Sequence, residues 1–173
     1  MYRSYSEHVF RLRGWDYRWE AYYFITMSCQ DRERYFGEVV DGKMCFTEIG
    51  YIAKRFWRSI FQHHPVAKID AFIVMPNHVH GILKLSPRPR TVAPQYIAGI
   101  RERDPMIIGP KKDSIGSIIR TYKGAVSRYA AKQSIDFQWQ GRFHDRIIRS
   151  EDELNNVRLY IQRNPKKWIE DGK

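Results

Sequence analysis

Apolar and polar residues follow two different periods along this chain, and together the two periods predict a mixture of strands and helices. Short runs rich in aromatic and β-branched residues are typical of strands, and apolar residues recurring at spacings of three and four are typical of helices. We expect strands at residues 21–29, 68–74, 78–85 and 143–149. A hairpin is expected at 35–46, because Asp41 and Gly42 separate two short apolar runs.

Three helices are expected, and each follows a residue whose side chain can cap a first turn. The caps are Thr47, Ser114 and Ser150. The first helix is expected to run to about residue 63, and the last to about Asn164, because Pro165 cannot donate a hydrogen bond within a helix. The order β, hairpin, α, β, β, α, β, α contains no repeat and predicts one α+β domain over residues 1–173.

The composition fits a folded domain with an anionic partner. Hydrophobic residues make up 43% of the 173 residues, which is too many for a disordered chain. The formal net charge of +11 favours a polyanion, either nucleic acid or an anionic membrane surface. The amino terminus has no apolar run of signal-peptide type, and no stretch approaches the roughly 18 apolar residues of a membrane helix. We therefore expect a cytoplasmic protein with no membrane partner.

Two segments depart from the regular pattern. Residues 1–20 mix Arg with aromatic residues, and we expect an arm that packs on the domain. Residues 86–113 hold five of the eight prolines and are expected to form a long loop or insertion. Cys29 and Cys45 lie in expected strands and form no CxxC pair, so both are expected to be reduced core cysteines.

Positive charge is concentrated in and after this proline-rich segment. Residues 86–130 contain nine Lys or Arg against three Asp or Glu, a net charge of +6. On the helix after Ser114, basic residues share the side away from the apolar stripe. The candidate DNA-binding residues there are Arg120, Lys123 and Arg128. A charged helix face can serve solvation alone, but charge of one sign beside a loop favours a surface for a phosphate backbone.

A pair of histidines marks the candidate site for chemistry. His78 and His80 flank Val79 at the start of an expected strand, within the run MPNHVHGIL at 75–83. Alternate residues of a strand point to the same face, so the two imidazoles project side by side and Val79 points into a core. Neutral imidazoles so placed can hold a divalent metal. The triplet alone favours the alternative interpretation, two satisfied or surface histidines on a strand.

The last expected helix carries a second polar pair. Tyr160 and Asn164 stand four residues apart, so they neighbour each other on one helix face. Taken alone, they read as a packing tyrosine and an asparagine that ends a helix before a proline. Their combination with the paired histidines is what favours a catalytic site.

Together these motifs resemble those of a known family. The run MPNHVHGIL resembles the His-hydrophobic-His motif of the HUH single-strand nucleases, and YIQRNP at 160–165 resembles the nucleophile helix of the single-tyrosine transposases. Within that superfamily the chain is most similar to the REP-associated tyrosine transposases. The preceding run FQWQGRFHDRIIRSEDEL and the early run YYFITMSCQDRERYFGEVVDG also resemble segments of that family.

The resemblance implies a ferredoxin-like antiparallel sheet with helices packed on one face, as in HUH endonucleases. It implies that His78 and His80 bind Mg2+ or Mn2+, that Asn164 completes the metal site and that Tyr160 is the nucleophile. The implied enzyme is a tyrosine transposase that cleaves and rejoins single-stranded DNA near REP-like hairpins through a 5′-phosphotyrosine intermediate. A tyrosine is a weak nucleophile at neutral pH, since its reference pKa is near 10, so it needs activation.

Three other functions remain open from the sequence. A domesticated relative could bind hairpin DNA without transposition activity. A hydrolytic nuclease could use a metal and water in place of the tyrosine. A basic ferredoxin-like domain could bind RNA, although this leaves the histidines unexplained. The protein is expected to act as a monomer or a homodimer.

Overall fold

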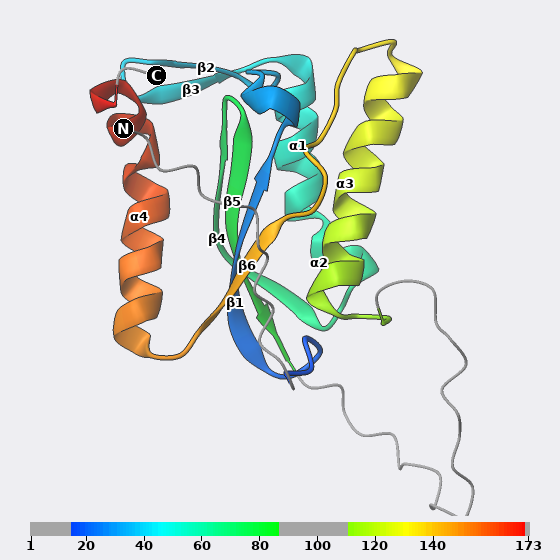
Figure 1. The fold of residues 1–173 in the computed structure, drawn as a ribbon, viewed down its shortest axis with the longest axis vertical. Helices are drawn as coiled ribbons and strands as arrows, with labels where there is room; N and C mark the ends of the chain where they lie inside the picture. Colours follow the sequence, from blue (N-terminus) through cyan, green and yellow to red (C-terminus); the bar gives the residue numbers. More distant parts are fainter. Residues whose placement is uncertain (1–14, 87–110, 172–173) are drawn as a thin grey trace, which may run out of the picture.

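A four-stranded antiparallel sheet forms the centre of the molecule. The structure is a computed structural model, and it describes residues 15–86 and 111–171. The strands stand in the order β4-β5-β1-β6. Their bounds are Ala21–Ser28 for β1, Ala67–Met75 for β4, His78–Leu85 for β5 and His144–Ile148 for β6. All neighbouring pairs are antiparallel, and β6 stands at one end of the sheet (Figure 1).

Helices cover both faces of this sheet. The long helices are α1 (Glu48–Arg58), α3 (Ile115–Lys132) and α4 (Glu151–Glu170). Helices α1 and α3 lie on one face and α4 lies on the other (Figure 1). The short helix α2 covers Ile60–His63, and a 3-10 turn, η1, covers Gln30–Arg32. Strands β2 (Gly37–Val40) and β3 (Lys43–Phe46) form a separate hairpin that turns at Asp41 and Gly42, both with positive φ.

The α+β, ferredoxin-like fold class is confirmed. Without the β2–β3 hairpin, the elements follow the β-α-β-β-α-β order of that fold. The expectation that helices pack on one face holds for α1 and α3, whereas α4 adds a layer on the second face. The reason is that the strands are apolar on both sides there. Leu154, Val157 and Ile161 of α4 pack with Ile82 and Ile148 of the sheet.

Strand β5 separates the two cores by its alternation. Val79 and Leu83 belong to the larger core with α1 and α3, while Ile82 belongs to the smaller core under α4. Gly81 is required on the larger-core side, because a Cβ atom there would meet the Trp57 ring at 2.1 Å. The burial of Val79 confirms the expected register, which turns His78 and His80 toward α4.

The prediction that the last helix ends near Asn164 is wrong. Helix α4 continues through Pro165 to Glu170. A proline inside a helix costs roughly 3 kcal/mol, because it removes one hydrogen bond and crowds the preceding turn. Trp168 offsets this cost, since the extra turn buries its side chain to 6% exposure against the ring of His78. The prediction that a proline ends a helix took account of the lost backbone hydrogen bond but not of the side-chain packing that a further turn provides.

The cysteine prediction is half right. Cys29 is buried in the larger core, but Cys45 is exposed on β3, which belongs to the small hairpin and not to the central sheet. Most of the amino-terminal arm predicted at 1–20 and of the loop predicted at 86–113 lies outside the described residues, namely 1–14 and 87–110. Within the described ranges, no helix combines the length and apolarity needed to cross a bilayer.

Candidate active site

The two histidines meet on the face of the sheet that α4 covers. They follow the turn after β4, and their ring centroids lie 4.5 Å apart. In the register of the sheet, His78 lies opposite Ser28 and His80 lies opposite Thr26 of β1. The strand backbone therefore sets their spacing, as the sequence pattern indicates.

The orientation of His78 is set by the preceding residue. Asn77 donates from Nδ2 to the backbone carbonyl of Arg32 at 3.0 Å, so its Oδ1 is the atom that faces His78. His78 Nδ1 lies 2.7 Å from this oxygen. Because a carboxamide oxygen only accepts, the proton must be on His78 Nδ1. The Nε2 atom then carries the lone pair, which is the tautomer a metal ligand requires.

His80 is deeper and is neutral for a different reason. Its side chain is 7% exposed, and burial lowers its pKa to about 3, with the neighbouring His78 as a smaller cause. Its Nδ1 lies 2.9 Å from Thr26 Oγ1, and its ring stacks on Phe24. The Thr26 hydroxyl can either donate or accept, and if Nδ1 donates to it, the lone pair would be on Nε2, as in His78.

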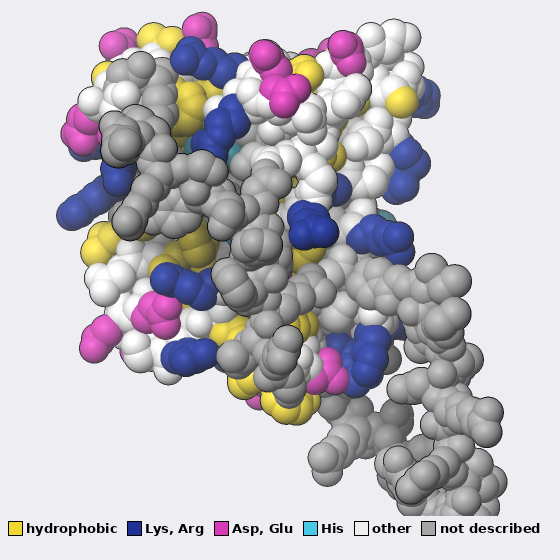
Figure 2. Space-filling view, in the orientation of Figure 1, with side chains coloured by type: hydrophobic (Ala, Val, Ile, Leu, Met, Phe, Trp, Pro, Cys, Tyr) yellow, Lys and Arg dark blue, Asp and Glu magenta, His cyan; other side chains and the backbone are white. Residues whose placement is uncertain are grey.

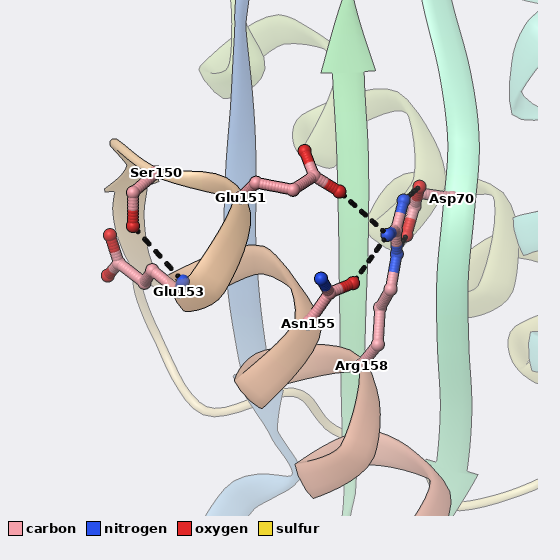
Figure 3. A network of polar contacts seen from close by, with 6 residues as sticks. All are labelled: Asp70, Ser150, Glu151, Glu153, Asn155 and Arg158. Carbon is pink, nitrogen blue, oxygen red and sulfur yellow. Dashed lines mark hydrogen bonds and ion pairs between the residues drawn. The ribbon is translucent and has the colours of Figure 1, made fainter.

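Helix α4 is held on the sheet by a polar network at its first turns. Ser150 caps the helix by accepting from the Glu153 backbone N–H at 3.1 Å. Arg158 donates to both carboxylate oxygens of Asp70 on β4, at 2.8 and 2.6 Å, and also contacts Glu151 and Asn155 (Figure 3). The carboxylate of Asp70 raises the pKa of the Arg158 guanidinium still further.

A β-bulge accounts for the position of Asp70. Ile69 pairs with Leu83 and Ala71 pairs with Ile82, so Asp70 is the extra residue between two consecutive pairs. A bulge redirects a side chain that regular alternation would place elsewhere. Here the bulge presents the Asp70 carboxylate to Arg158, which precedes Tyr160 by two residues on α4.

The network brings Tyr160 to the histidines. Its phenolic oxygen lies 3.3 Å from His80 Nε2, and its ring meets that of Phe24 edge-on. With the proton of His80 on Nδ1, the phenol is the donor in this contact. Tyr160 as a residue is 41% exposed, and it lines a hollow beside the sheet. The predicted proximity of Tyr160 to the paired histidines is thus present within a single chain.

Asn164 takes a more buried position than Tyr160. It continues the buried stripe of α4 between Ile161 and Trp168, and it is 7% exposed. Trp168, one turn later, lies over His78 with ring centroids 5.8 Å apart. The carboxamide therefore belongs to the helix face that covers the histidine pair.

The donor set fits a divalent cation of modest affinity. A carboxamide oxygen suits Mg2+ or Mn2+, whereas imidazole nitrogens are softer ligands than these cations usually prefer, and three protein ligands would leave positions for water or phosphate oxygens. No group of three His, Cys, Asp or Glu side chains suited to a metal occurs in residues 15–86 and 111–171. Any cation here would therefore depend on the neutral Asn164 or on the substrate for its third ligand.

The predicted DNA-binding residues of α3 lie on the opposite side of the sheet from Tyr160. Arg120 and Lys123 line a hollow of about 1000 Å3 between α3 and residues 137–143, and Arg128 lies outside its lining. The Lys123 ammonium donates to the carbonyls of Gln140 and Arg142, at 2.8 and 3.0 Å, and it is held against Trp139. In this structure Lys123 fastens the segment before β6 to α3.

Sequence reasoning missed the residues that orient the site. Asn77, Thr26 and the Asp70–Arg158 pair each fix a histidine or the tyrosine helix. The PNH triplet was the available signal for Asn77, since an asparagine before a strand histidine can hydrogen-bond its ring. His144 was passed over, yet it lies directly across β1 from His80 in the register, with Thr26 between them.

Comparison with known proteins supports the fold and a family. No protein-family model matches the chain. A solved structure of a REP-associated tyrosine transposase bound to a REP hairpin is similar, with a TM-score of 0.59, 18% identity and coverage of 91% of this chain and 73% of that chain. At this identity the likeness shows the fold, which is thus transposase-like.

A much stronger sequence likeness is to an uncharacterized protein of Haemophilus influenzae. The two are 34% identical over 165 residues, which cover 93% of this chain and 89% of that protein. The chain belongs to the same protein family as this Haemophilus influenzae protein.

Proposed function

We propose that this protein is a metal-dependent single-stranded DNA transposase or endonuclease, which cleaves and rejoins DNA near hairpin sequences through a 5′-phosphotyrosine intermediate. The observation that carries the proposal is the 3.3 Å contact between Tyr160 Oη and His80 Nε2, two atoms from residues 80 positions apart. A tyrosine that served only packing would not need to place its hydroxyl at a pair of oriented imidazoles.

The tyrosine performs the bond exchange. The phenol gives up its proton as its oxygen attacks the phosphorus, the bond from phosphorus to the 3′ oxygen breaks, and that oxygen takes up a proton, so that a free 3′-hydroxyl is released with no net change in protons. The phosphodiester energy is kept in the phosphotyrosine bond, so a second 3′-hydroxyl can reverse the step without ATP. Before a cation binds, the contact with His80 Nε2 holds the phenol beside the histidine pair.

The remaining residues bind and orient. His78, His80 and Asn164 are the residues that would hold Mg2+ or Mn2+. When bound, such a cation would stabilise negative charge on the phosphodiester oxygens. Phe24 and Trp168 pack against the His80 and His78 rings and exclude water from one side of the site. The likeness to a transposase that carries a REP hairpin supports hairpin DNA as the substrate class.

A covalent-adduct assay tests the proposal. The protein is incubated with labelled hairpin DNA carrying single-stranded flanks and with Mn2+, and denaturing gels reveal a protein–DNA species. We expect an adduct from the wild type and none from Tyr160→Phe. Tyr51→Phe is the matched control, because Tyr51 is an exposed tyrosine on α1, away from the site.

The outcomes separate the competing functions. Salt-sensitive hairpin binding without any adduct identifies a DNA-binding protein that has no strand-transfer activity. Cleavage that persists in Tyr160→Phe without a covalent species identifies a hydrolytic nuclease. An adduct of equal yield from Tyr160→Phe contradicts the role given to this residue.

A further inference from the structure

A hollow opens directly beside the tyrosine. Its volume is about 450 Å3, and Phe24, His144 and Val157 are among the residues that line it with Tyr160. The apolar walls come from the sheet and from α4, and β6 supplies polar side chains. Anything that fills this hollow therefore touches the nucleophile on one side and strand β6 on the other.

This hollow continues around the end of the sheet. Thr26 and His144 also line a second, more polar hollow of about 830 Å3, which includes Arg32 and Arg142. Arg142 and Phe143 in turn line the hollow of about 1000 Å3 beside Arg120 on α3. Each hollow shares lining residues with the next, so the three are neighbours that follow one another from Tyr160 across β6 to α3. We name this series of hollows the β6 furrow.

The charge of the β6 furrow is mainly positive. His144 and Arg146 occur at alternate positions of β6, which places them on the same face of the end strand, and Arg142 lies in the bend just before this strand. Arg146 is paired with Glu153, and two acidic residues line the furrow, Asp145 in the hollow beside Tyr160 and Asp31 in the second hollow. Figure 2 shows this side of the molecule in the orientation of Figure 1, with Lys and Arg side chains spread over it, some of them near its centre.

Aromatic rings accompany the basic residues along the furrow. Phe24 stands at the tyrosine end, and Phe143 and Trp139 stand at the α3 end. Trp139 is fixed by donating its indole N–H to the Lys123 carbonyl at 3.2 Å. Basic groups that track a backbone, together with rings that can stack unpaired bases, form the recognised surface for single-stranded nucleic acid. Hollows lined in this way suit unstacked nucleotides better than a duplex.

We propose that the β6 furrow binds the single strand that flanks the cleavage point, with the nucleotide at the scissile phosphate in the hollow beside Tyr160. The inference rests on the proposed function for the identity of the reacting phosphate. Arg142 contacts the strand where it crosses β6, and His144 contacts it next to the tyrosine. Lys123 is a positioning residue, because it holds the carbonyls of the segment that carries Arg142.

Binding measurements on flanked and unflanked hairpins test this path. Fluorescence anisotropy of the wild type is measured with a hairpin whose flank is lengthened one nucleotide at a time, on each side in turn. The same series is repeated with Arg142→Gln and with His144→Ala. Lys68→Gln is the matched control, because Lys68 is an exposed basic residue on β4, the end strand at the opposite edge of the sheet.

We expect the wild type to bind more tightly as one flank grows, and Arg142→Gln to lose most of this gain. The loss of one phosphate contact should lower the slope of log affinity against log salt by about 0.7 on single strands. His144→Ala should weaken binding once the first flanking nucleotide is present. All variants should bind the unflanked hairpin as the wild type does, and Lys68→Gln should match the wild type throughout.

Three results overturn the path. The first is that the affinity of the wild type does not change with flank length. The second is that Arg142→Gln and His144→Ala bind flanked DNA with the affinity and salt slope of the wild type. The third is that these variants lose the same affinity for the hairpin with and without a flank. Thermal melting of each variant reveals any loss of folding. Failure of the proposed function is distinguishable, because the wild type would then show flank-dependent binding but form no adduct.

Discussion

Arg158 of α4 grips Asp70 of β4 through two hydrogen bonds of 2.8 and 2.6 Å, and this contact anchors the helix two residues before Tyr160. The ion pair is partly exposed, with 37% of the Arg158 side chain accessible, so its effect on stability is about 1 kcal/mol or less. Its more important effect is geometric, because it fixes the position of α4 on the sheet and so the position of Tyr160 relative to the histidine pair.

Loss of this pair should reduce activity more than stability. We expect Asp70→Asn to lower the rate of adduct formation by about tenfold or more, as small misplacements of a reacting group are costly, while the melting temperature falls by only a few degrees. Arg158→Lys keeps the charge but not the paired hydrogen bonds, and it should be intermediate. The control is Lys84→Gln, which removes the contact with Glu20 on another part of the sheet. An unchanged rate in Asp70→Asn would show that α4 is positioned by its apolar stripe alone.

Gly81 should tolerate no side chain. Its added Cβ would lie 2.1 Å from the Trp57 ring, so we expect Gly81→Ala to destabilise the protein by about 1–3 kcal/mol through overpacking. Denaturant unfolding measures this change. Gly141→Ala is the matched control, since nothing lies within 4 Å of a Cβ atom there. Equal losses in the two variants would contradict the close approach of α1 to β5.

The two cysteines should differ in reactivity. Burial raises the pKa of the Cys29 thiol to about 12, whereas Cys45 is exposed. A thiol reagent at neutral pH should therefore label one cysteine in the folded protein and both after unfolding, and Cys45→Ser should remove the native reaction. Rapid labelling of Cys29 in the folded state would contradict its place in the core.

The same thiol predicts an alkaline loss of stability. The folded-state pKa of Cys29 is raised, so the unfolded chain ionises first, and its contribution is complete below about pH 9 and falls as pH rises toward 12. The slope from this group is about 1.4 kcal/mol per pH unit. Denaturant titrations at increasing pH measure it, and Cys29→Ala should show a shallower decline. An identical decline in both proteins would assign the effect to other groups.

The proposed cation site should respond to removal of the tyrosine hydroxyl. The Nε2 lone pair of His80 that accepts from Tyr160 is the one a cation would use, so the phenol competes with it. We expect Tyr160→Phe to bind Mn2+ as tightly as the wild type or up to about fivefold more tightly, because a hydrogen bond of about 1 kcal/mol is removed. Calorimetric titration without DNA measures this, and His80→Ala should abolish binding.

His63→Ala serves as the control for that titration, because His63 is exposed at the end of α2 and should leave Mn2+ binding unchanged. Weaker binding by Tyr160→Phe would instead make the phenol a ligand of the cation. That result would keep the site but change the role of its tyrosine before DNA binds.

Local patterns predicted the elements that carry the chemistry. The alternation around Val79 gave the faces of β5, and the caps Thr47, Ser114 and Ser150 each accept from a backbone N–H as expected. These features depend on residues within a few positions of one another, so a single sequence contains them. The meeting of Tyr160 with His80 followed only from resemblance to a family, since nothing local relates two residues so far apart.

Long-range contacts explain what the patterns missed. The continuation of α4 past Pro165 buries Trp168 against His78, a contact between residues far apart in the sequence. The bulge at Asp70 has no turn residue that would predict it from the sequence. The carboxylate that it presents is bound by Arg158, 88 positions later. In the sequence Lys123 looked like a charged surface residue available to DNA. In the structure its ammonium donates to the carbonyls of Gln140 and Arg142, in a segment whose path depends on the sheet. His80, Thr26 and His144 lie side by side on neighbouring strands, and this could be predicted only from the register of all three strands.

The most direct measurement of the central claim is mass spectrometry of the covalent protein–DNA species after digestion with trypsin and a nuclease. We predict that a 5′-linked nucleotide phosphate is found on the peptide of residues 159–163, and that its fragments place the added mass on Tyr160. A nucleotide on a different tyrosine, or no modified peptide from protein incubated with flanked hairpin DNA and Mn2+, would contradict the account.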